Sequence, residues 1–190
     1  MSKLKKLDLG NNPTLECVFL KNVDVEDDTI FENLNEINVS KCKNLRVIDI
    51  EQAGEKFTEL DLSSNDKLNS LGLEGLRGLK QLKMPETDNL KEIVVKETAL
   101  ESLALEKYTK LDKVCVGGNQ FDTLKINMEQ KTEKDIENMY LLFDNNLKVE
   151  FISSKNGIVP NIKRLDNHNL WAGIVFSNYV VTDYEIPECW

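Results

Sequence analysis

The sequence is poor in the residues from which most active sites are built. Among 190 residues there is one histidine, His168, which lies in the polar run DNHN. No serine or cysteine stands in a motif that would activate it as a nucleophile, and the glycine pair at 117–118 lacks the Lys-Ser/Thr of a phosphate-binding loop. We therefore expect no enzymatic activity, no catalytic residue and no cofactor.

Cysteine is sparse and scattered along the chain. The four cysteines form no C-x-x-C pair and have no neighbouring histidine, so a zinc or other metal site is not expected. Three of them occupy repeat positions that carry other residues elsewhere, and we interpret them as reduced thiols. This interpretation favours a reducing compartment, the cytoplasm. The cysteines are Cys17, Cys42, Cys115 and Cys189.

Long apolar runs are missing as well. No stretch approaches the roughly 18 apolar residues of a membrane span. The start, MSKLKKLDLGNN, has neither the apolar run nor the small-residue cleavage site of a secretory signal. The sequence therefore predicts no membrane span and a cytoplasmic location. The alternative is a cell-surface or secreted protein whose export signal has been cut away.

Positive charge is in deficit, with 24 Lys and Arg against 33 Asp and Glu and a net charge of -9. This balance argues against direct binding of nucleic acid, which requires a basic footprint on the protein. It allows a protein partner with a basic surface, because complementary fields speed encounter. The simpler alternative is that the acidic surface only keeps the protein soluble.

What the sequence has in abundance is one frame, L-x-x-L-x-L. In each copy the last two apolar residues flank a variable one, which is the period of a short strand with one face inward. The copies alternate between two classes of following link, as in LDLGNNPTL and VVKETAL, so the full repeat is about 22 residues with two strands. The frames are LKKLDL (4–9), LECVFL (15–20), LNEINV (34–39), LRVIDI (45–50), FTELDL (57–62), LNSLGL (68–73), LKQLKM (79–84), LKEIVV (90–95), LESLAL (100–105), LDKVCV (111–116) and FDTLKI (121–126).

These frames resemble the leucine-rich repeat family, in its short type of bacterial or phage proteins. The resemblance implies a β-rich solenoid, in which each coil turns its leucines to a shared interior and stacking buries the core. Because both sides of a coil are short strands, we expect a stack of parallel strands with weak curvature. We predict about 5 to 6 such coils over residues 1–127 and a small α+β C-terminal cap over residues 128–190.

The resemblance also implies a ladder of turn side chains. Asn12, Asn65 and Asn119 stand where the family places an asparagine that bonds the backbone of the turn, and Cys42 stands there as a substitute. Thr87 and Tyr108 occupy the same place in later coils. We expect the ladder to be interrupted at these two residues.

The frame breaks once, between Leu20 and Leu34, where the link carries Glu26, Asp27 and Asp28 in a row. A bulged loop or one helical turn is one reading of this link. An acidic contact loop and an oxygen-rich calcium site are the others, although the D-x-D-x-D spacing and glycine of a calcium loop are absent.

The character of the sequence changes at about residue 128. Residues 132–143 are predicted to form a helix with Thr132 as N-cap, followed by extended segments at 148–153 and 158–165 and by one or two strands within 171–186. Eight of the thirteen aromatic residues lie in this part of the chain. They either form the core of the cap or supply exposed anchors for a partner.

Candidate binding residues come from the variable positions between the inward leucines and from the aromatic C-terminus. Rigid strands with variable outward residues suit recognition of a protein surface, which is the usual role of this family. The candidates are Phe19, Asp49, Glu51, Glu74, Val94, Lys96, Trp171, Tyr179, Tyr184 and Trp190.

The function that we predict is a non-enzymatic protein-protein interaction module. Its acidity suggests an inhibitor or adaptor of a basic protein, for example one that processes nucleic acid. The alternative is a fragment of a bacterial cell-surface leucine-rich-repeat adhesin. The first coil has almost nothing before Leu4 to cover it, which indicates truncation, self-association or a docked partner.

Overall fold

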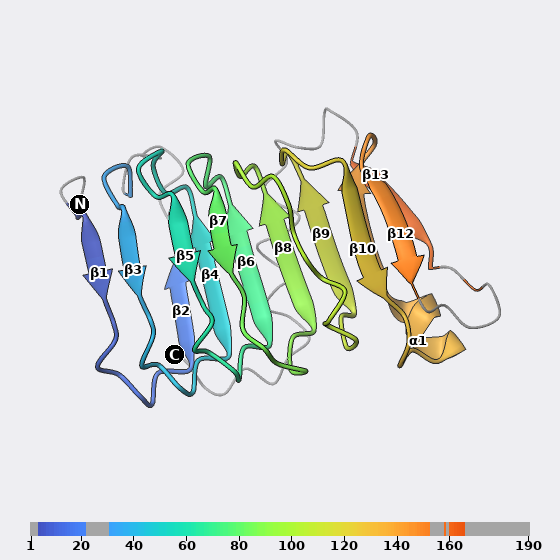
Figure 1. Cartoon of the computed structure of the whole chain (residues 1–190), viewed down its shortest axis with the longest axis horizontal. Coiled ribbons are helices and arrows are strands. Elements are labelled where there is room, and N and C mark those ends of the chain that lie inside the picture. The colour runs from blue at the N-terminus through green and yellow to red at the C-terminus, as the bar shows by residue number, and fades with distance from the viewer. Residues whose placement is uncertain (1–3, 22–30, 153–157, 159, 166–190) are drawn as a thin grey trace.

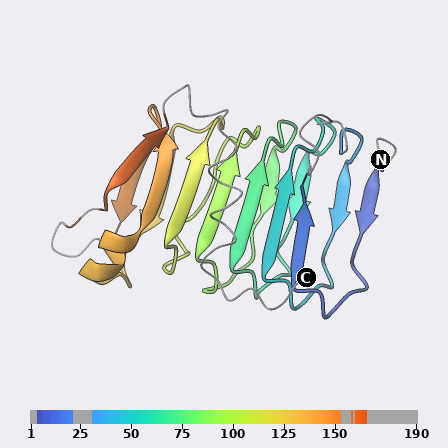
Figure 2. The ribbon, with the colours of Figure 1, turned by 180° about the vertical axis from the view of Figure 1, so that it is seen from behind.

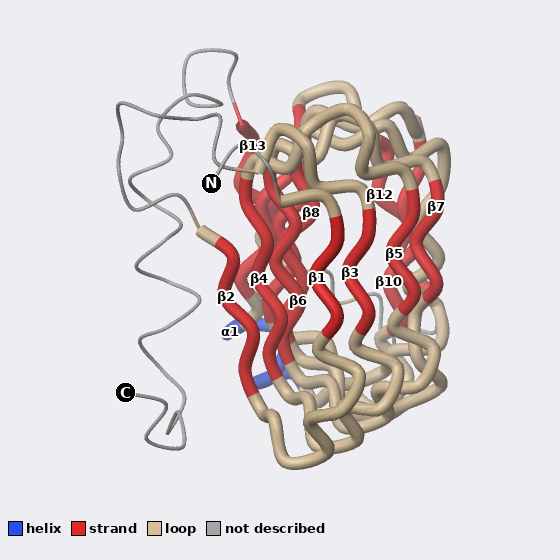
Figure 3. The backbone as a smooth tube through the Cα atoms, turned by 90° about the vertical axis from the view of Figure 1, so that its left-hand side faces the viewer, coloured by secondary structure: helices blue, strands red, loops and turns tan. Residues whose placement is uncertain are grey.

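The fold is a parallel β-solenoid of about five turns with almost no helix (Figure 1). The computed structural model describes residues 4–21, 31–152, 158 and 160–165. Each coil places one segment in each of two walls, which face each other across the interior (Figure 3). The stack is weakly curved, which confirms the predicted fold class.

One wall, which we call the wide wall, is a continuous sheet in which every pairing is parallel. Figure 2 shows it as an unbroken row of strands along the stack. Its seven strands, in spatial order, are β13 (Ile162–Leu165), β11 (Tyr140–Asp144), β9 (Lys113–Gly117), β8 (Glu92–Lys96), β6 (Ser70–Glu74), β4 (Val47–Glu51) and β2 (Cys17–Leu20).

The opposite wall, which we call the split wall, consists of three separate two-stranded parallel sheets. Residues 98–106, the split-wall segment of the coil between β8 and β9, are described but belong to none of these sheets. The pairs are β1 (Lys6–Asp8) with β3 (Glu36–Asn38), β5 (Glu59–Asp61) with β7 (Gln81–Lys83), and β10 (Thr123–Asn127) with β12 (Lys148–Ile152).

The strand register confirms the repeat length. Val47 pairs with Ser70, Ser70 with Glu92, and Glu92 with Lys113, which are steps of 23, 22 and 21 residues. The step from Cys17 to Val47 is 30 residues, because the long link that begins after Leu20 falls in this coil. The acidic run at 26–28 lies outside the described residues.

The interior is one apolar cluster that runs through the stack. Leu71 of β6 and Leu60 of β5 come from opposite walls of the same coil, and both are buried. Burial of each such side chain contributes about 1.5 to 3 kcal/mol. Stacking therefore creates a core that no single coil could close, as the repeat predicts.

The strands of the wide wall end at corners with left-handed backbone. Gln52, Gly75, Glu97 and Gly118 have φ values of 55°, 70°, 50° and 65°. At the first three corners the backbone N–H donates to a carbonyl at the end of the next strand, over 2.8 to 3.1 Å. The corner thus extends the ladder by one bond beyond the strand.

Several strands of the split wall end differently, in turns closed by a side chain. Asp8, Asn38 and Asp61 are the last residues of β1, β3 and β5, and each side chain accepts the backbone N–H of the residue two positions later. Such turns satisfy the hydrogen bond of a backbone N–H locally and direct the chain away from the sheet.

The predicted ladder of turn side chains is present and reaches from coil to coil. Asn12 donates to Leu9 O within its own turn, and Asn119 donates to Val95 O one coil back. The Cys42 thiol donates to Leu9 O over 3.1 Å, so this cysteine does substitute for asparagine.

The interruption expected in the later coils is wrong. Asn65 Nδ2 donates to Val39 O and Cys42 O, Thr87 Oγ1 donates to Asp66 O over 2.5 Å, and the buried Tyr108 hydroxyl donates to Pro85 O over 2.8 Å. Hydroxyl groups can make the same bond as an amide to the preceding coil, and the length of tyrosine lets it reach a carbonyl that a shorter side chain would miss. The ladder therefore tolerates four kinds of side chain.

The helix predicted over residues 132–143 is much shorter in the structure. α1 spans Glu133–Asn138 and begins with a capping box, in which Thr132 and Asp135 exchange side-chain and backbone hydrogen bonds. Residues 140–144 instead form strand β11, which pairs with β9. The hydrogen bonds and side-chain packing that this segment gains by pairing with the edge of β9 stabilise it more than its weak helix propensity would.

The segment after residue 128 continues both walls. β11 and β13 extend the wide wall, and β12 pairs in parallel with β10 of the split wall. The strand predicted at 148–153 is confirmed as β12. Residues 166–190, which contain the strands predicted within 171–186, lie outside the described part, and the domain boundary at 127/128 stays a prediction.

Candidate functional site

The outward side chains of the wide wall form an ordered surface, which we call the wide face. Because the strands are in parallel register, equivalent positions of successive coils lie side by side. The central column of this face runs along the register as Phe19, Asp49, Gly72, Val94, Cys115 and Leu142.

Charged side chains at the N-terminal end of the wide face are paired with one another. Lys21 Nζ lies 2.7 Å from Asp49 Oδ2 and 3.0 Å from Glu51 Oε1. Burial by itself lowers the pKa of Lys21, but the Asp49 charge and the hydrogen bonds to both carboxylates raise the pKa above its ordinary value. Lys21 therefore stays charged and holds two acidic side chains of the neighbouring coil.

Gly72 makes room for one of these carboxylates. A Cβ at this position would lie 2.5 Å from Asp49 Oδ1, closer than real contacts allow. The Asp49 side chain thus leans over Gly72 towards the next coil. Glycine at this place in the column is required for the present position of Asp49.

A second set of ion pairs lies farther along the face. Lys96 is fully buried, and its Nζ lies 2.7 Å from Glu74 Oε1. The Nζ of Lys113 lies 3.7 Å from Glu92 Oε1, and both residues are buried. Buried charges of this kind depend strongly on their partners.

The middle of the central column is apolar and separate from the interior. Val94, Cys115 and Leu142 form their own buried cluster, with the half-buried Tyr140 packed against it. Burial raises the pKa of the Cys115 thiol to about 12. At neutral pH the thiol is protonated, so Cys115 lacks the thiolate character of a reactive cysteine.

Phe19 stands apart from this cluster at the N-terminal end of the same column. Its exposed fraction is 41%, and no other large apolar side chain among the described residues is exposed. β2, which carries Phe19, pairs with β4 at one edge of the sheet. The wide face thus has an exposed apolar end beside the Lys21 cluster and a buried middle.

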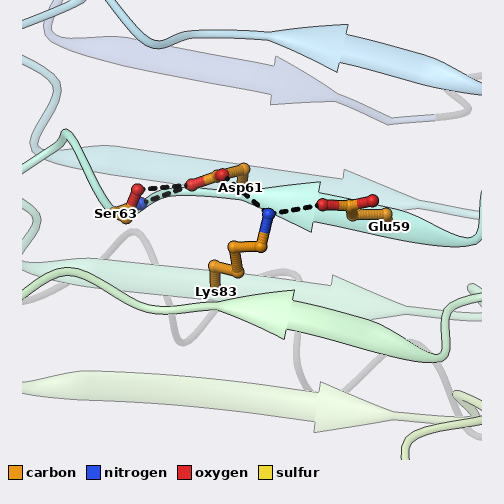
Figure 4. A network of polar contacts seen from close by, with 4 residues as sticks. All are labelled: Glu59, Asp61, Ser63 and Lys83. Carbon is orange, nitrogen blue, oxygen red and sulfur yellow. Dashed lines mark hydrogen bonds and ion pairs between the residues drawn. The ribbon is translucent and has the colours of Figure 1, made fainter.

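The outward surface of the split wall, which we call the split face, carries exposed charge networks. Figure 4 shows Lys83, whose Nζ lies 2.7 Å from Glu59 Oε1 and 3.2 Å from Asp61 Oδ2. Hydrogen bonds from Ser63, followed by the contact with Lys83, lower the pKa of Asp61. The hydrogen bond to Glu59 is the main reason why the pKa of Lys83 is raised.

The structure brings six of the ten predicted binding residues onto the wide face. Phe19 is exposed, Glu51 and Glu74 are half-buried, and the other three, Asp49, Val94 and Lys96, are buried. Trp171, Tyr179, Tyr184 and Trp190 lie outside the described residues. Sequence reasoning missed Leu142, because it was placed in a helix, and the apolar run YLLFD lacks the alternation that would have assigned it to a strand.

In the described part of the chain, no group of three or more His, Cys, Asp or Glu residues is placed to hold a metal ion. The same part contains no helix that is both long enough and apolar enough to cross a membrane. No family model and no curated protein matches the chain. Any function must therefore be argued from the two faces themselves.

Proposed function

We propose that the chain is a non-enzymatic protein-binding module of the leucine-rich-repeat type, and that its partner docks at the N-terminal end of the wide face. The observation that carries this proposal is the exposed Phe19 beside the ion pairs of Lys21 with Asp49 and Glu51. An aromatic side chain ringed by polar groups is typical of the anchor residues of protein interfaces.

The leucine-rich-repeat assignment is supported by the repeat itself. The L-x-x-L-x-L frames place their last two apolar residues inward, as Leu71 and Leu73 do in β6. Turn side chains such as Asn65 bond backbone carbonyls, as the family's asparagine is expected to do, although these carbonyls belong to the preceding coil and not to its own turn. A rigid stack of this kind holds outward residues in fixed positions, which lowers the entropic cost of binding.

The net charge of -9 supports a partner with a basic surface, and hence an inhibitor or adaptor of a basic protein. On the wide face, however, Asp49, Glu51 and Glu74 already have lysine partners. A basic partner would have to compete with these lysines. Charge should therefore contribute more to the rate of encounter, and Phe19 more to affinity.

A cytoplasmic location is supported by the thiols that the structure describes. Cys42 and Cys115 are free, and both are buried. Free buried thiols persist most readily in a reducing compartment.

Self-association through the first coil is a second candidate. Leu7 of β1 and Leu20 of β2 are half-buried, whereas their counterparts in the next coil, Ile37 and Ile50, are buried. A second copy that covered this end would bury them fully. Sedimentation equilibrium tests this candidate, because Leu7→Glu should then reduce the fraction of dimer.

The test of partner binding uses the full chain as immobilised bait in extracts of the source cell. Phe19→Ser should weaken binding of the captured partner by roughly thirtyfold, the effect of losing about 2 kcal/mol from an interface anchor. Gln81→Ser, an exposed change on the split face, is the matched control and should leave recovery unchanged. Equal recovery by both variants would remove the N-terminal end of the wide face from the proposal.

Charge is tested separately with Glu51→Gln, because Glu74 is the partner of the buried Lys96. We expect slower association with little change in the dissociation rate, measured by surface plasmon resonance at low and physiological salt. Association rates that match those of the native chain at both salt concentrations would exclude a role for this charge in steering.

A further inference from the structure

The first coil leaves one end of the interior partly exposed, and Figure 3 shows the molecule from this end. Its inward leucines are half-buried, whereas the apolar residues at the same places in the second coil are buried. These leucines therefore form an apolar patch, which we call the N-terminal end patch. They are Leu4, Leu7, Leu9, Leu15 and Leu20, and their counterparts are Leu34, Ile37, Val39, Leu45 and Ile50.

β1 is the last strand of the split wall at this end and offers a free edge. Among the described residues its one strand neighbour is β3. Leu9 N donates to Asn38 O over 2.9 Å, which turns the backbone groups of the odd-numbered residues of β1 towards β3. Successive residues of a strand point these groups to opposite sides, so the N–H and C=O of Lys6 and Asp8 face the free edge. Such an edge readily pairs with another strand.

The sequence of β1, Lys6-Leu7-Asp8, is complementary to itself when two copies lie antiparallel. Leu7 then faces Leu7 of the second copy, and each Lys6 faces an Asp8. Both charged side chains are exposed, so opposite charges meet across the pair. The backbone groups at the edge supply two hydrogen bonds for each Lys6–Asp8 pair. Lys6 already contacts Glu36 and would lie between this residue and Asp8 of the second copy.

The alternative arrangement, a head-to-tail stack, brings like charges together. β12 ends the split wall at the other end, and its residues 148–150 occupy the same places in the coil as residues 6–8 of β1. A second copy that continued the stack would place Lys148 beside Lys6. It would also place Glu150 beside Asp8. Like charges at opposed positions destabilise a strand pair, so the charges favour a closed dimer over an open filament.

We propose that the protein forms a head-to-head dimer, in which β1 of one copy pairs antiparallel with β1 of a second copy about a two-fold axis between the two Leu7 residues. The proposal rests on the self-association named above as the second candidate, and adds the strand, the register and the symmetry. The dimer covers the N-terminal end patch of both copies. β2 is the end strand of the wide wall at the same end, so the two Phe19 side chains lie beside the junction.

Charge exchange tests the register. Lys6→Glu and Asp8→Lys should each weaken the dimer by roughly tenfold or more in sedimentation equilibrium, because each change opposes like charges. An equal mixture of the two variants should regain the native affinity, because the exchanged charges complement each other in the heterodimer. Lys80→Glu and Glu55→Lys make the same changes of net charge at exposed residues of inner coils. They are the matched controls and should leave the dimer intact.

The outcomes separate the proposed pairing from self-association itself. A native chain that stays monomeric at every concentration overturns both. A dimer that withstands Lys6→Glu and Asp8→Lys, or a mixture of folded variants that does not regain affinity, overturns the pairing alone. Species that grow beyond the dimer indicate head-to-tail stacking, which also overturns it. Circular dichroism shows whether each variant is folded.

Disulfide trapping keeps the pairing testable if a charge variant unfolds. The two Leu7 residues would form a non-hydrogen-bonded pair, in which the Cα atoms lie about 4.5 Å apart, a distance that a disulfide can bridge. In a Cys17→Ser background, Leu7→Cys oxidised with copper phenanthroline should therefore give a disulfide between two copies, joined at this position in mass spectrometry of peptides. Leu82→Cys, at the equivalent half-buried position of β7, is the control and should give none. Absence of the link from Leu7→Cys would overturn the proposal.

Discussion

The two walls of the solenoid are built from the same apolar frame, yet one is a continuous sheet and the other is broken into three. Five strands of the wide wall are five residues long, whereas β1, β3, β5 and β7 of the split wall have three. The inward leucines do not account for this difference, because both walls contribute to one core. The two walls also differ in how several of their strands end.

Strand ends on the wide wall pass hydrogen bonds onward, through left-handed corners such as Gln52 and Gly75 that donate to the next coil. Strand ends on the split wall turn the backbone towards a side chain such as Asp61. One core pattern is therefore compatible with two kinds of strand end.

The largest effect is expected in the interior, where the walls should behave alike. Leu71→Ala on the wide wall and Leu60→Ala on the split wall should each lower the free energy of unfolding by about 2 to 5 kcal/mol, through lost burial and a residual cavity. Urea denaturation followed by circular dichroism measures both. A cost below about 1 kcal/mol for Leu60→Ala alone would show that the split wall contributes little to the common core.

The second largest effect is a loss of stability that should differ between the wide face and the split face. Glu74→Ala removes a partner of the fully buried Lys96, whereas Glu59→Ala removes a partner of the exposed Lys83. We expect a loss of about 2 kcal/mol or more for Glu74→Ala and a clearly smaller loss for Glu59→Ala, because solvent screens the exposed pair. Denaturation midpoints at matched ionic strength provide the comparison. Equal losses would mean that burial of the ion pair has no energetic consequence.

A smaller gain is expected at the corners of the wide wall. Gln52 has a left-handed φ of 55°, a conformation that costs an L-residue about 1 kcal/mol and glycine nothing comparable. Gln52→Gly should therefore raise stability by about 0.5 to 1 kcal/mol, measured as a higher urea midpoint. The reciprocal variant Gly75→Ala at the equivalent corner should lower it, and a gain there would contradict the role given to the corners.

The smallest effect concerns pH at the split face. Ser63 and Lys83 lower the pKa of Asp61 below its ordinary value of 3.8. The ionised carboxylate therefore stabilises the folded protein, and this stabilisation is fully present above pH 3.8. It is lost as pH falls through the lowered pKa. Ser63→Ala should move the pKa of Asp61 upward in a carbon-13 NMR titration, while Ser40→Ala in another coil should not.

Much of the fold could be predicted because the repeat encodes it locally. Apolar residues such as Leu60 and Leu71 recur at a fixed period, and eleven copies of one frame make the register of the coils nearly certain. Residues 140–144 were misassigned because their identity as a strand depends on the free edge of β9, which no local pattern reveals. The same holds for Tyr108, whose bond to Pro85 requires knowledge of the neighbouring coil.

The candidate site was predictable only in part. The column position of Asp49 and Val94 follows from the frame, but their burial does not. Whether a charged residue in this column is available depends on its partner in a neighbouring coil, as Lys21 of the preceding coil shows for Asp49. A pattern read along one strand contains no information about such pairs.

The ladder of turn side chains also has a direction. Cys42, Asn65, Thr87 and Tyr108 each donate to a carbonyl of the coil that precedes them in the chain. During synthesis the acceptor coil leaves the ribosome first, and each new coil arrives with the donor that completes it. This direction is compatible with assembly coil by coil from the N-terminus.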